Sequence, residues 1–157
     1  MTTSQSADVR LRAAGPADGP DILTLSLAAF GKEHAPTLRT LAARVETWRE
    51  SKSPTVVARD EAGVFLGFAF SKPNEAGTFA RSEGQTAQLT QVAVVPEARG
   101  QGVGKVLVDR SLKTLKLLGF SRVQAQLQQS VVRWYENQGW TVLPKGQVKA
   151  WIEPHIA

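Results

Sequence analysis

The chain has 157 residues, 42% of them hydrophobic, which suits one domain around one core. We therefore expect residues 1–157 to form a single domain, with residues 1–7 as a flexible tail. The absence of cysteine excludes disulfides, cysteine zinc sites and a cysteine nucleophile. The two histidines, His34 and His155, lack metal-ligand spacing, so we expect no metal.

The net charge of +5 would suit an anionic partner. The basic residues are scattered from Arg10 to Lys149 in ones and twos, without the basic runs that follow a nucleic-acid backbone, so we expect no nucleic acid. No apolar stretch reaches membrane-spanning length, and the N-terminus lacks the pattern of a secretory signal. The sequence therefore predicts a cytoplasmic protein without membrane contact.

Hydrophobic periodicity and turn residues predict the elements in the order β-α-α-β-β-β-α-β-α-β-β. Apolar residues at helical spacing in the second helix form a stripe of Leu38, Leu41, Val45 and Trp48, which we interpret as core. The expected elements are a strand at 9–12, helices at 18–30 and 36–50, a hairpin of strands 55–59 and 64–70, a polar loop at 72–85, a strand at 86–95, a helix at 102–118, a strand at 121–128, a helix at 131–138, and terminal strands around residues 142 and 151.

An apolar strand, a glycine-rich turn and an amphipathic helix follow one another in the C-terminal half. The first turn of a helix has N–H groups without carbonyl partners, and its dipole places partial positive charge there, so this arrangement predicts an anion site. Gly100, Gly102 and Gly104 remove β-carbons that would keep a diphosphate away from these amides. Arg99 and Lys105 add positive charge at the rim.

Two common phosphate-binding loops do not fit this turn. The nucleoside-triphosphate loop requires glycine where Arg99 stands and serine or threonine where Val106 stands. The dinucleotide fingerprint would require glycine at Lys105 or at Leu107.

The motif Arg99-x-x-Gly102-x-Gly104, after a strand ending in Val-Ala-Val-Val-Pro, resembles the acyl-coenzyme A signature of the GNAT N-acetyltransferase superfamily. A second segment, WYENQGW at residues 134–140, is similar to the family's helix that ends in Tyr-Glu-x-x-Gly-aromatic. Together the two motifs cover the C-terminal half, whereas the N-terminal half agrees only in the order of its elements.

The resemblance implies an α+β (mixed α/β) fold with a central mixed, mostly antiparallel β-sheet flanked by about four helices. In this GNAT-like fold two central strands, here 86–95 and 121–128, splay apart and hold the cofactor. The implied cosubstrate is acetyl-coenzyme A (acetyl-CoA). A homodimer is common among relatives, and the terminal strand at 148–152 could support one.

The resemblance also assigns site residues. Main-chain groups of the strand bind the pantetheine arm, and the glycine turn binds the diphosphate. Gln128 stands where many relatives carry asparagine, so its amide is a candidate contact to the pantetheine or the acceptor. The expected cofactor-binding residues are Val92, Ala93, Val94, Arg99, Gly100, Gln101, Gly102, Val103, Gly104, Lys105 and Gln128.

Tyr135 matches the family tyrosine that protonates the leaving thiolate and is the expected catalytic residue. A thiol titrates near ~8.5 and a phenol near ~10, so the hydroxyl could stabilise the sulfur as its charge develops. The alternative is that Tyr135 only packs beside Trp134, with its hydroxyl hydrogen-bonded to backbone. We expect Trp134 in the core, and Glu136 and Asn137 in solvent.

The general base is not identified. Gln124, Gln126 and Gln128 alternate on one strand face, and carboxamides cannot remove a proton; the alternative is an exposed strand face. A water chain or an acidic side chain from elsewhere would then deprotonate the amine. We interpret His34 as a surface residue. The acidic candidates, without a ranking, are Glu33, Glu75 and Glu83, and the residues expected to line the acceptor pocket by fold analogy are Phe30 and Trp48.

The leading hypothesis is an acetyl-CoA-dependent N-acetyltransferase in which a primary amine attacks the thioester directly, since no cysteine exists for an acyl-enzyme. The alternative is a non-catalytic acyl-CoA-binding sensor or regulatory module. A basic nucleic-acid binder is a third reading, which the scattered charge disfavours. The acceptor cannot be named from the sequence.

Overall fold

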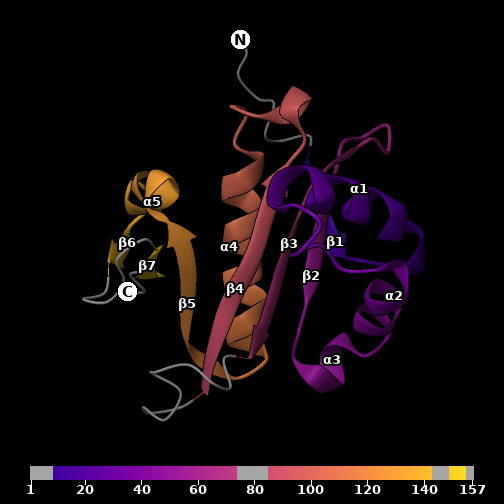
Figure 1. Cartoon of the computed structure of the whole chain (residues 1–157). Helices are drawn as coiled ribbons and strands as arrows, with labels where there is room; N and C mark the ends of the chain where they lie inside the picture. Colours follow the sequence, from indigo (N-terminus) through magenta and orange to yellow (C-terminus); the bar gives the residue numbers. More distant parts are fainter. Residues whose placement is uncertain (1–8, 74–84, 143–148, 155–157) are drawn as a thin grey trace.

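The structure is a computed structural model that describes residues 9–73, 85–142 and 149–154 (Figure 1). The expected tail at 1–7 lies outside these residues. The strands are β1 (Arg10–Ala13), β2 (Thr55–Arg59), β3 (Phe65–Pro73), β4 (Gln85–Val94), β5 (Phe120–Gln128), β6 (Trp140–Val142) and β7 (Lys149–Pro154). The helices are α1 (Gly19–Phe30), α2 (Leu38–Glu46), α3 (Trp48–Ser51), α4 (Val103–Leu117) and α5 (Gln129–Glu136), with 3-10 turns at Pro16–Asp18 and Pro96–Ala98.

The strands form one seven-stranded sheet in the order β1-β2-β3-β4-β5-β7-β6. β4 and β5 run parallel, and every other neighbouring pair is antiparallel. The connection between the parallel strands passes through α4, as a parallel pair requires. The predicted mixed, mostly antiparallel sheet is therefore confirmed, and so is the hairpin of β2 and β3.

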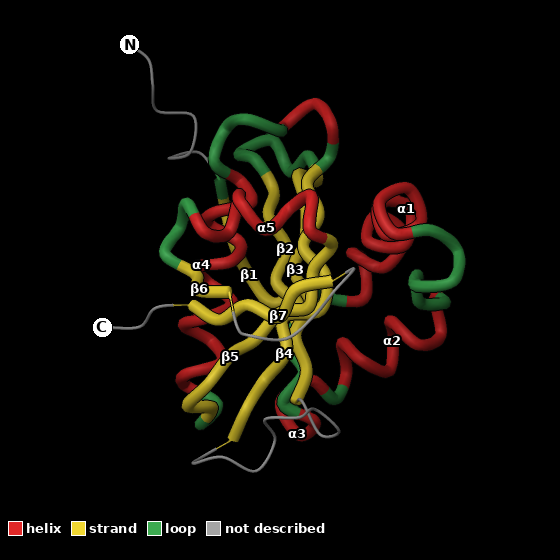
Figure 2. Tube along the Cα trace, turned by 60° about the vertical axis from the view of Figure 1, so that its left-hand side comes forward, coloured by secondary structure: helices red, strands yellow, loops and turns green. Residues whose placement is uncertain are grey.

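Helices cover both faces of this sheet (Figure 2). α1 and α2 lie on one face, where Ile22 and Leu41 pack in a buried cluster with Val57 and Phe68 of the sheet. α4 and α5 lie on the opposite face (Figure 2). Strand residues therefore alternate between two cores.

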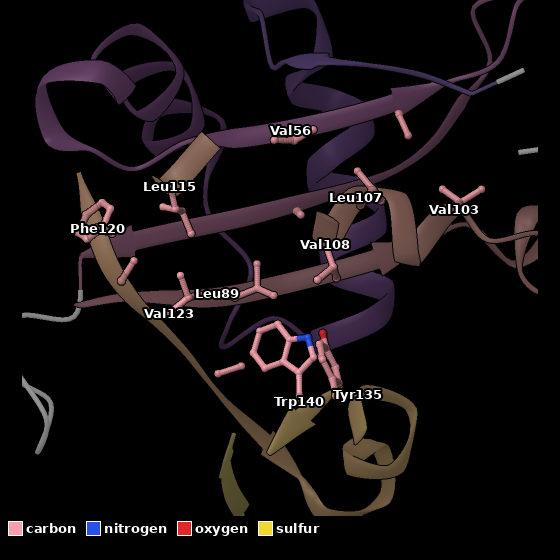
Figure 3. Close-up of a cluster of buried hydrophobic side chains, with 14 of the residues drawn as sticks. Val56, Leu89, Val103, Leu107, Val108, Leu115, Phe120, Val123, Tyr135 and Trp140 are labelled. Carbon is pink, nitrogen blue, oxygen red and sulfur yellow. The ribbon is translucent and has the colours of Figure 1, made fainter. Parts of the chain in front are cut away.

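The cluster on the α4 side is the larger of the two and extends from α4 across the sheet to α5 (Figure 3). Leu107 and Leu115 of α4 are fully buried in it. Tyr135 of α5 and Trp140 of β6 belong to the same cluster. The elements on both sides of the parallel pair thus share one core.

The observed elements differ most from the prediction in two places. The expected helix at 36–50 is interrupted at Thr47 (φ −112°, ψ 17°), whose hydroxyl donates to the Ala43 carbonyl at 2.9 Å. In its predicted core stripe Leu41 is buried, whereas Leu38 is 52% exposed, so Leu38 was wrongly placed. The expected polar loop at 72–85 is shorter, because the ladder between β3 and β4 continues through Pro73↔Ala87 beyond a β-bulge.

A buried carboxylate fixes the start of α1. Asp18 is fully buried and accepts hydrogen bonds from Arg12 (2.8 Å), Arg59 (2.7 Å) and the Gly15 amide (2.7 Å). Burial alone would raise the pKa of Asp18, but the bonds from Arg12, Gly15 and Arg59 outweigh it and hold the pKa below its ordinary 3.8. This cluster ties β1 and β2 to α1.

We expect Gly67→Ala to destabilise the fold. A β-carbon at position 67 of β3 would collide with the Ala93 carbonyl oxygen and lie 3.1 Å from Val94 Cα and 3.2 Å from Leu107 Cδ1. Because two of these atoms belong to the backbone of β4, the strand itself would have to move. The free energy of unfolding, measured by chemical denaturation, should fall by about 2–3 kcal/mol.

Gly15→Ala is the matched control. Its β-carbon would lie 3.8 Å from Arg12 Nη1 and from Asp18 Oδ2, which are ordinary contacts, and the backbone at position 15 is extended (φ −111°, ψ 176°). Because alanine adopts this extended conformation readily before a proline, we expect no loss of stability. A Gly67→Ala protein as stable as the unmodified chain would contradict the close approach of β3 and β4.

Candidate functional site

The two parallel strands separate after a short paired segment. β4 pairs with β5 from Gln85↔Phe120 to Gln88↔Gln124. Beyond this point Ala125 to Gln128 of β5 pair with β7, its other neighbour in the sheet, and β4 and β5 diverge toward the top of Figure 1. The splay of the central strands that the resemblance implied is therefore present in the fold.

The main chain of β4 faces this opening at alternate residues. The Val95 N–H donates to the Leu66 carbonyl at 2.9 Å, so Val95 points its backbone groups toward β3. Because these directions alternate along a strand, Ala93 also points toward β3, whereas Val92 and Val94 point toward the opening. Of the three predicted strand residues, Val92 and Val94 are the two whose backbone groups can reach a ligand there.

The glycine turn leads from the end of β4 into α4. Gly100 (φ 78°) and Gly102 (φ 84°) adopt left-handed backbone angles that favour glycine. Gly102 is the N-cap residue and has no side-chain cap, and α4 begins at Val103, one residue later than predicted. The first amides of α4, starting at Val103, therefore have no helical carbonyl partner, so they can bind an anion.

Three polar side chains of this turn contact neighbouring groups of the protein. The Arg99 Nε donates to the Val94 carbonyl at 3.2 Å, and the Gln101 amide donates to the Glu97 carbonyl at 3.4 Å. Lys105 forms an exposed ion pair with Asp109 at 2.8 Å. The carboxylate of Asp109 partly offsets the positive charge that Lys105 brings to the first turn.

Trp134 does not lie in the core, so that prediction was wrong. Its side chain is 42% exposed and rests on Gly104 in the first turn of α4. A β-carbon at position 104 would lie 3.2 Å from Trp134 Cζ2. Gly104 therefore differs from Gly100 and Gly102: its missing side chain makes room for the indole.

Tyr135 is buried between two aromatic rings (Figure 3). Its ring makes edge contacts with Trp134 (centroids 4.7 Å apart) and Trp140 (5.1 Å). Burial raises the pKa of Tyr135 to about 12. Its hydroxyl points from α5 toward β4 (Figure 3).

The glutamine row of β5 does not form one uniform surface. Gln124 is fully buried and Gln126 is exposed. The side chain of Gln128 lies outside what the structure describes, as do Glu75 and Glu83. Glu33 is exposed in the turn that follows α1.

His34 is exposed in the same turn, in agreement with its interpretation as a surface residue. Phe30 is half-buried and packs against the cluster under α1. Trp48 is half-buried in α3. No contact of Phe30 or Trp48 tests their expected place in an acceptor pocket.

Gln91 is a buried residue that the sequence reasoning missed. Its Oε1 accepts from the Ser26 hydroxyl at 3.0 Å, and its Nε2 donates to the His34 carbonyl at 2.9 Å. It thereby fastens α1 and the following turn, which carries Glu33, to the part of β4 that has left β5. The available signal was a long polar side chain within an apolar strand, between Leu89 and Ala93.

Neither a metal-binding cluster nor a membrane-spanning helix is found among the residues that the structure describes. No cluster there of three or more histidine, cysteine, aspartate or glutamate residues could hold a metal ion. No helix in the described ranges has both the length and the apolar character needed to cross a membrane.

Sequence relatives are acetyltransferases. A mycothiol acetyltransferase of Beutenbergia cavernae is 29% identical over 150 residues, 90% of this chain and 48% of that protein. An uncharacterized N-acetyltransferase ycf52-like of Prochlorococcus marinus is 39% identical over 71 residues, 43% of this chain and 39% of that protein. The chain thus spans less than half the length of these curated relatives.

Solved structures share the fold. The ribosomal-protein-alanine N-acetyltransferase from Brucella melitensis superimposes with a TM-score of 0.75 at 20% identity, covering 94% of this chain and 99% of that one. A phosphinothricin acetyltransferase from Sinorhizobium meliloti in complex with AcCoA gives 0.73 at 24% identity, covering 93% and 87%. The sequence model of the Acetyltransferase (GNAT) family matches residues 20–140. The chain therefore belongs to the GNAT acetyltransferase family.

Proposed function

We propose that this chain transfers an acetyl group from acetyl-CoA to a primary amine of an acceptor still to be identified. The observation that carries the proposal is the opening between β4 and β5, which leads from the first turn of α4 to the strand edge at Val94 and Val92. One end of this path suits a diphosphate and the other suits the amides of a pantetheine arm. Membership of the GNAT family supports the cosubstrate.

The proposed cofactor contacts follow from this path. Backbone groups of Val92 and Val94 would bind the pantetheine amides, and the turn from Gly100 to Lys105 would bind the diphosphate with its amides. Arg99 would contribute charge close to the end of β4. Gln128 ends β5 on the other side of the opening. Its amide would contact the pantetheine or the acceptor.

The chemical step is a direct acyl transfer. The amine nitrogen attacks the thioester carbonyl carbon, the carbon–sulfur bond breaks, and coenzyme A leaves as a thiolate that takes up a proton, while the amine loses one. With a pKa of about 12, Tyr135 keeps its proton at neutral pH. We propose that its hydroxyl acts as the acid, donating to the sulfur as negative charge develops.

The acceptor would approach from the α1 side of the sheet, since the core under α4 fills the opposite side. The turn held by Gln91 brings Glu33 and His34 to this side of β4, and both side chains are exposed. Of the three acidic candidates, Glu33 is the one whose side chain the structure describes, and it is exposed in this turn.

Acetyl-CoA should bind the purified protein with micromolar affinity in calorimetry, whereas ATP, a polyanion without a pantetheine arm, should bind far more weakly. Gly102→Ala should weaken acetyl-CoA binding, because alanine strains the left-handed N-cap (φ 84°) that presents the α4 amides.

Gly119→Ala provides the control for this measurement. Gly119 also has a positive φ (103°) and lies beyond the opposite end of α4, so the substitution introduces similar strain far from the turn. It should leave acetyl-CoA affinity unchanged. Absence of acetyl-CoA binding, or equal binding of ATP, would refute the proposed cofactor site.

Tyr135→Phe should lower kcat about 100-fold with an amine acceptor found by screening, since it removes the proton donor to the thiolate. Cofactor affinity by calorimetry should stay nearly unchanged, because the ring and its contacts remain. Unchanged kcat would assign Tyr135 to packing alone. If no amine is acetylated and Tyr135→Phe changes nothing, the chain is the sensor or regulatory module instead.

Tyr135 is the single tyrosine of the chain, so its titration can be followed directly by tyrosinate absorbance. The midpoint should lie at about 12 in the folded protein and near ~10 in denaturant. Because folding raises this pKa, the associated stability is complete below pH ~10 and is lost as pH rises toward the folded value. Tyr135→Phe should remove this alkaline loss, and a folded midpoint near ~10 would contradict burial of the hydroxyl.

A further inference from the structure

Arg44 of α2 is a partly buried cation whose charge is not balanced by a neighbouring anion. Its guanidinium carbon lies 3.6 Å from the centroid of the Phe70 ring in β3. In the ranges that the structure describes, neither a hydrogen bond nor an ion pair joins this guanidinium to another residue. Burial lowers the pKa of Arg44 from its ordinary value, yet a guanidinium keeps its charge at neutral pH. Its N–H groups are therefore available to an anionic ligand.

The guanidinium lies on the face of the sheet over which the acceptor would approach. Phe70 belongs to the buried cluster under α1 and α2, and it pairs with Gln91 of β4. The Gln91 side chain is on the same face, where it bonds to the Ser26 hydroxyl and the His34 carbonyl. Paired strands are ~5 Å apart, so the guanidinium lies about one strand spacing from β4 and roughly 5–10 Å from the opening on the other side of β4.

Lys72 brings a second positive charge to this face. Ser71 pairs with Leu89, which belongs to the core under α4, so the next residue of β3, Lys72, has its side chain on the opposite face. Lys72 is exposed and forms no ion pair with any residue described by the structure. It stands opposite Gln88, the last residue of β4 that pairs with β5. Two cations therefore lie beside the segment of β4 where the parallel strands separate.

We infer that Arg44, assisted by Lys72, binds a carboxylate of the acceptor, so that the acceptor is a primary amine that also carries a carboxylate. The inference rests on the proposed function and deepens it, because it names the chemical class of the acceptor. A guanidinium can donate two parallel hydrogen bonds to one carboxylate. The contact with Phe70 holds the guanidinium in place without supplying a hydrogen-bond acceptor. Lys72 adds a point charge on a flexible stem.

The positions of the two groups also limit the length of the acceptor. Its nitrogen must reach the thioester in the opening while its carboxylate stays at Arg44, roughly 5–10 Å away. An amine and a carboxylate on the same carbon atom are too close together for this. Amino acids with several methylene groups between the amine and the carboxylate span the distance, and γ-aminobutyrate and ε-aminocaproate are simple examples.

The test measures coenzyme A release from acetyl-CoA with two matched pairs of acceptors: γ-aminobutyrate against γ-aminobutyramide, and ε-aminocaproate against ε-aminocaproamide. The unmodified chain should acetylate each carboxylate with a kcat/KM about tenfold above that of its carboxamide. Arg44→Gln should abolish this preference by raising KM for the carboxylates, and it should leave the carboxamides unchanged. Lys72→Gln should reduce the preference by roughly threefold.

Arg39→Gln is the matched control, because Arg39 is an exposed arginine on the same helix and forms no ion pair within the described part of the chain. It should leave the preference as it is. Arg44→Lys keeps the positive charge and guards against a folding defect, and it should retain part of the preference. Acetyl-CoA affinity by calorimetry should be the same in all of these variants.

Equal kcat/KM for carboxylate and carboxamide in the unmodified chain would overturn the inference. An equal loss of both activities in Arg44→Gln would also overturn it, since Arg44 would then only pack on Phe70. The inference fails as well if other primary amines are acetylated but neither carboxylate is. If the unmodified chain binds no acetyl-CoA, or acetylates no amine at all, it is the proposed function that fails.

Discussion

The short parallel ladder between β4 and β5 is the constraint on which the rest of the site depends. A strand edge with unpaired N–H and C=O groups is normally covered or blunted, because it would otherwise pair with another chain. Here β5 turns to β7 after Gln124, and β4 continues beside β3 with Val92 and Val94 facing the gap. An extended ligand with amide groups could hydrogen-bond to such an edge. At one end of the edge, the first amides of α4 supply partial positive charge.

Three long-range contacts hold the elements around this opening, and each joins segments that are distant in sequence. Asp18 fixes the start of α1 to β1 and β2 through Arg12 and Arg59. Gln91 fixes the end of α1 and the next turn to β4. On the other face Trp134 rests on Gly104. The Gln91 and Trp134 contacts therefore involve β4 and the helix that follows it, whereas the Asp18 cluster holds α1 at the edge of the sheet where β1 and β2 pair.

The sequence predicted the elements and the glycine turn because both depend on local patterns. Helical and alternating periodicity gave the strands and helices to within a few residues, and the spacing of Arg99, Gly102 and Gly104 indicated the family. The errors arose where a distant partner decides the outcome. Leu38 fits the helical stripe, yet α2 presents it to solvent. Trp134 looks like a core residue in the sequence, whereas in the structure it packs against Gly104 of α4 and remains partly exposed.

Gln91 shows the same limit more clearly, because its partners are a hydroxyl on α1 and a carbonyl in a turn. Neither a strand pattern nor a motif can indicate a bond to the His34 carbonyl, more than fifty residues earlier in the chain. The catalytic assignment of Tyr135 came from the motif, whereas its burial and raised pKa come from Trp134 and Trp140 packing around it.

The three directions in which β4 presents its groups separate the tasks that acetyl transfer requires. The backbone edge of Val92 and Val94 faces the opening, the side chains of these residues pack toward the α4 core, and the Gln91 side chain faces α1. In the proposed function the cofactor would use the edge, and the amine would arrive over the α1 face. Acceptor choice would then depend on α1, α2 and the turn between them, which lie in the half of the chain that matches neither motif. A family signature can therefore identify the cofactor of such a protein while leaving its acceptor open.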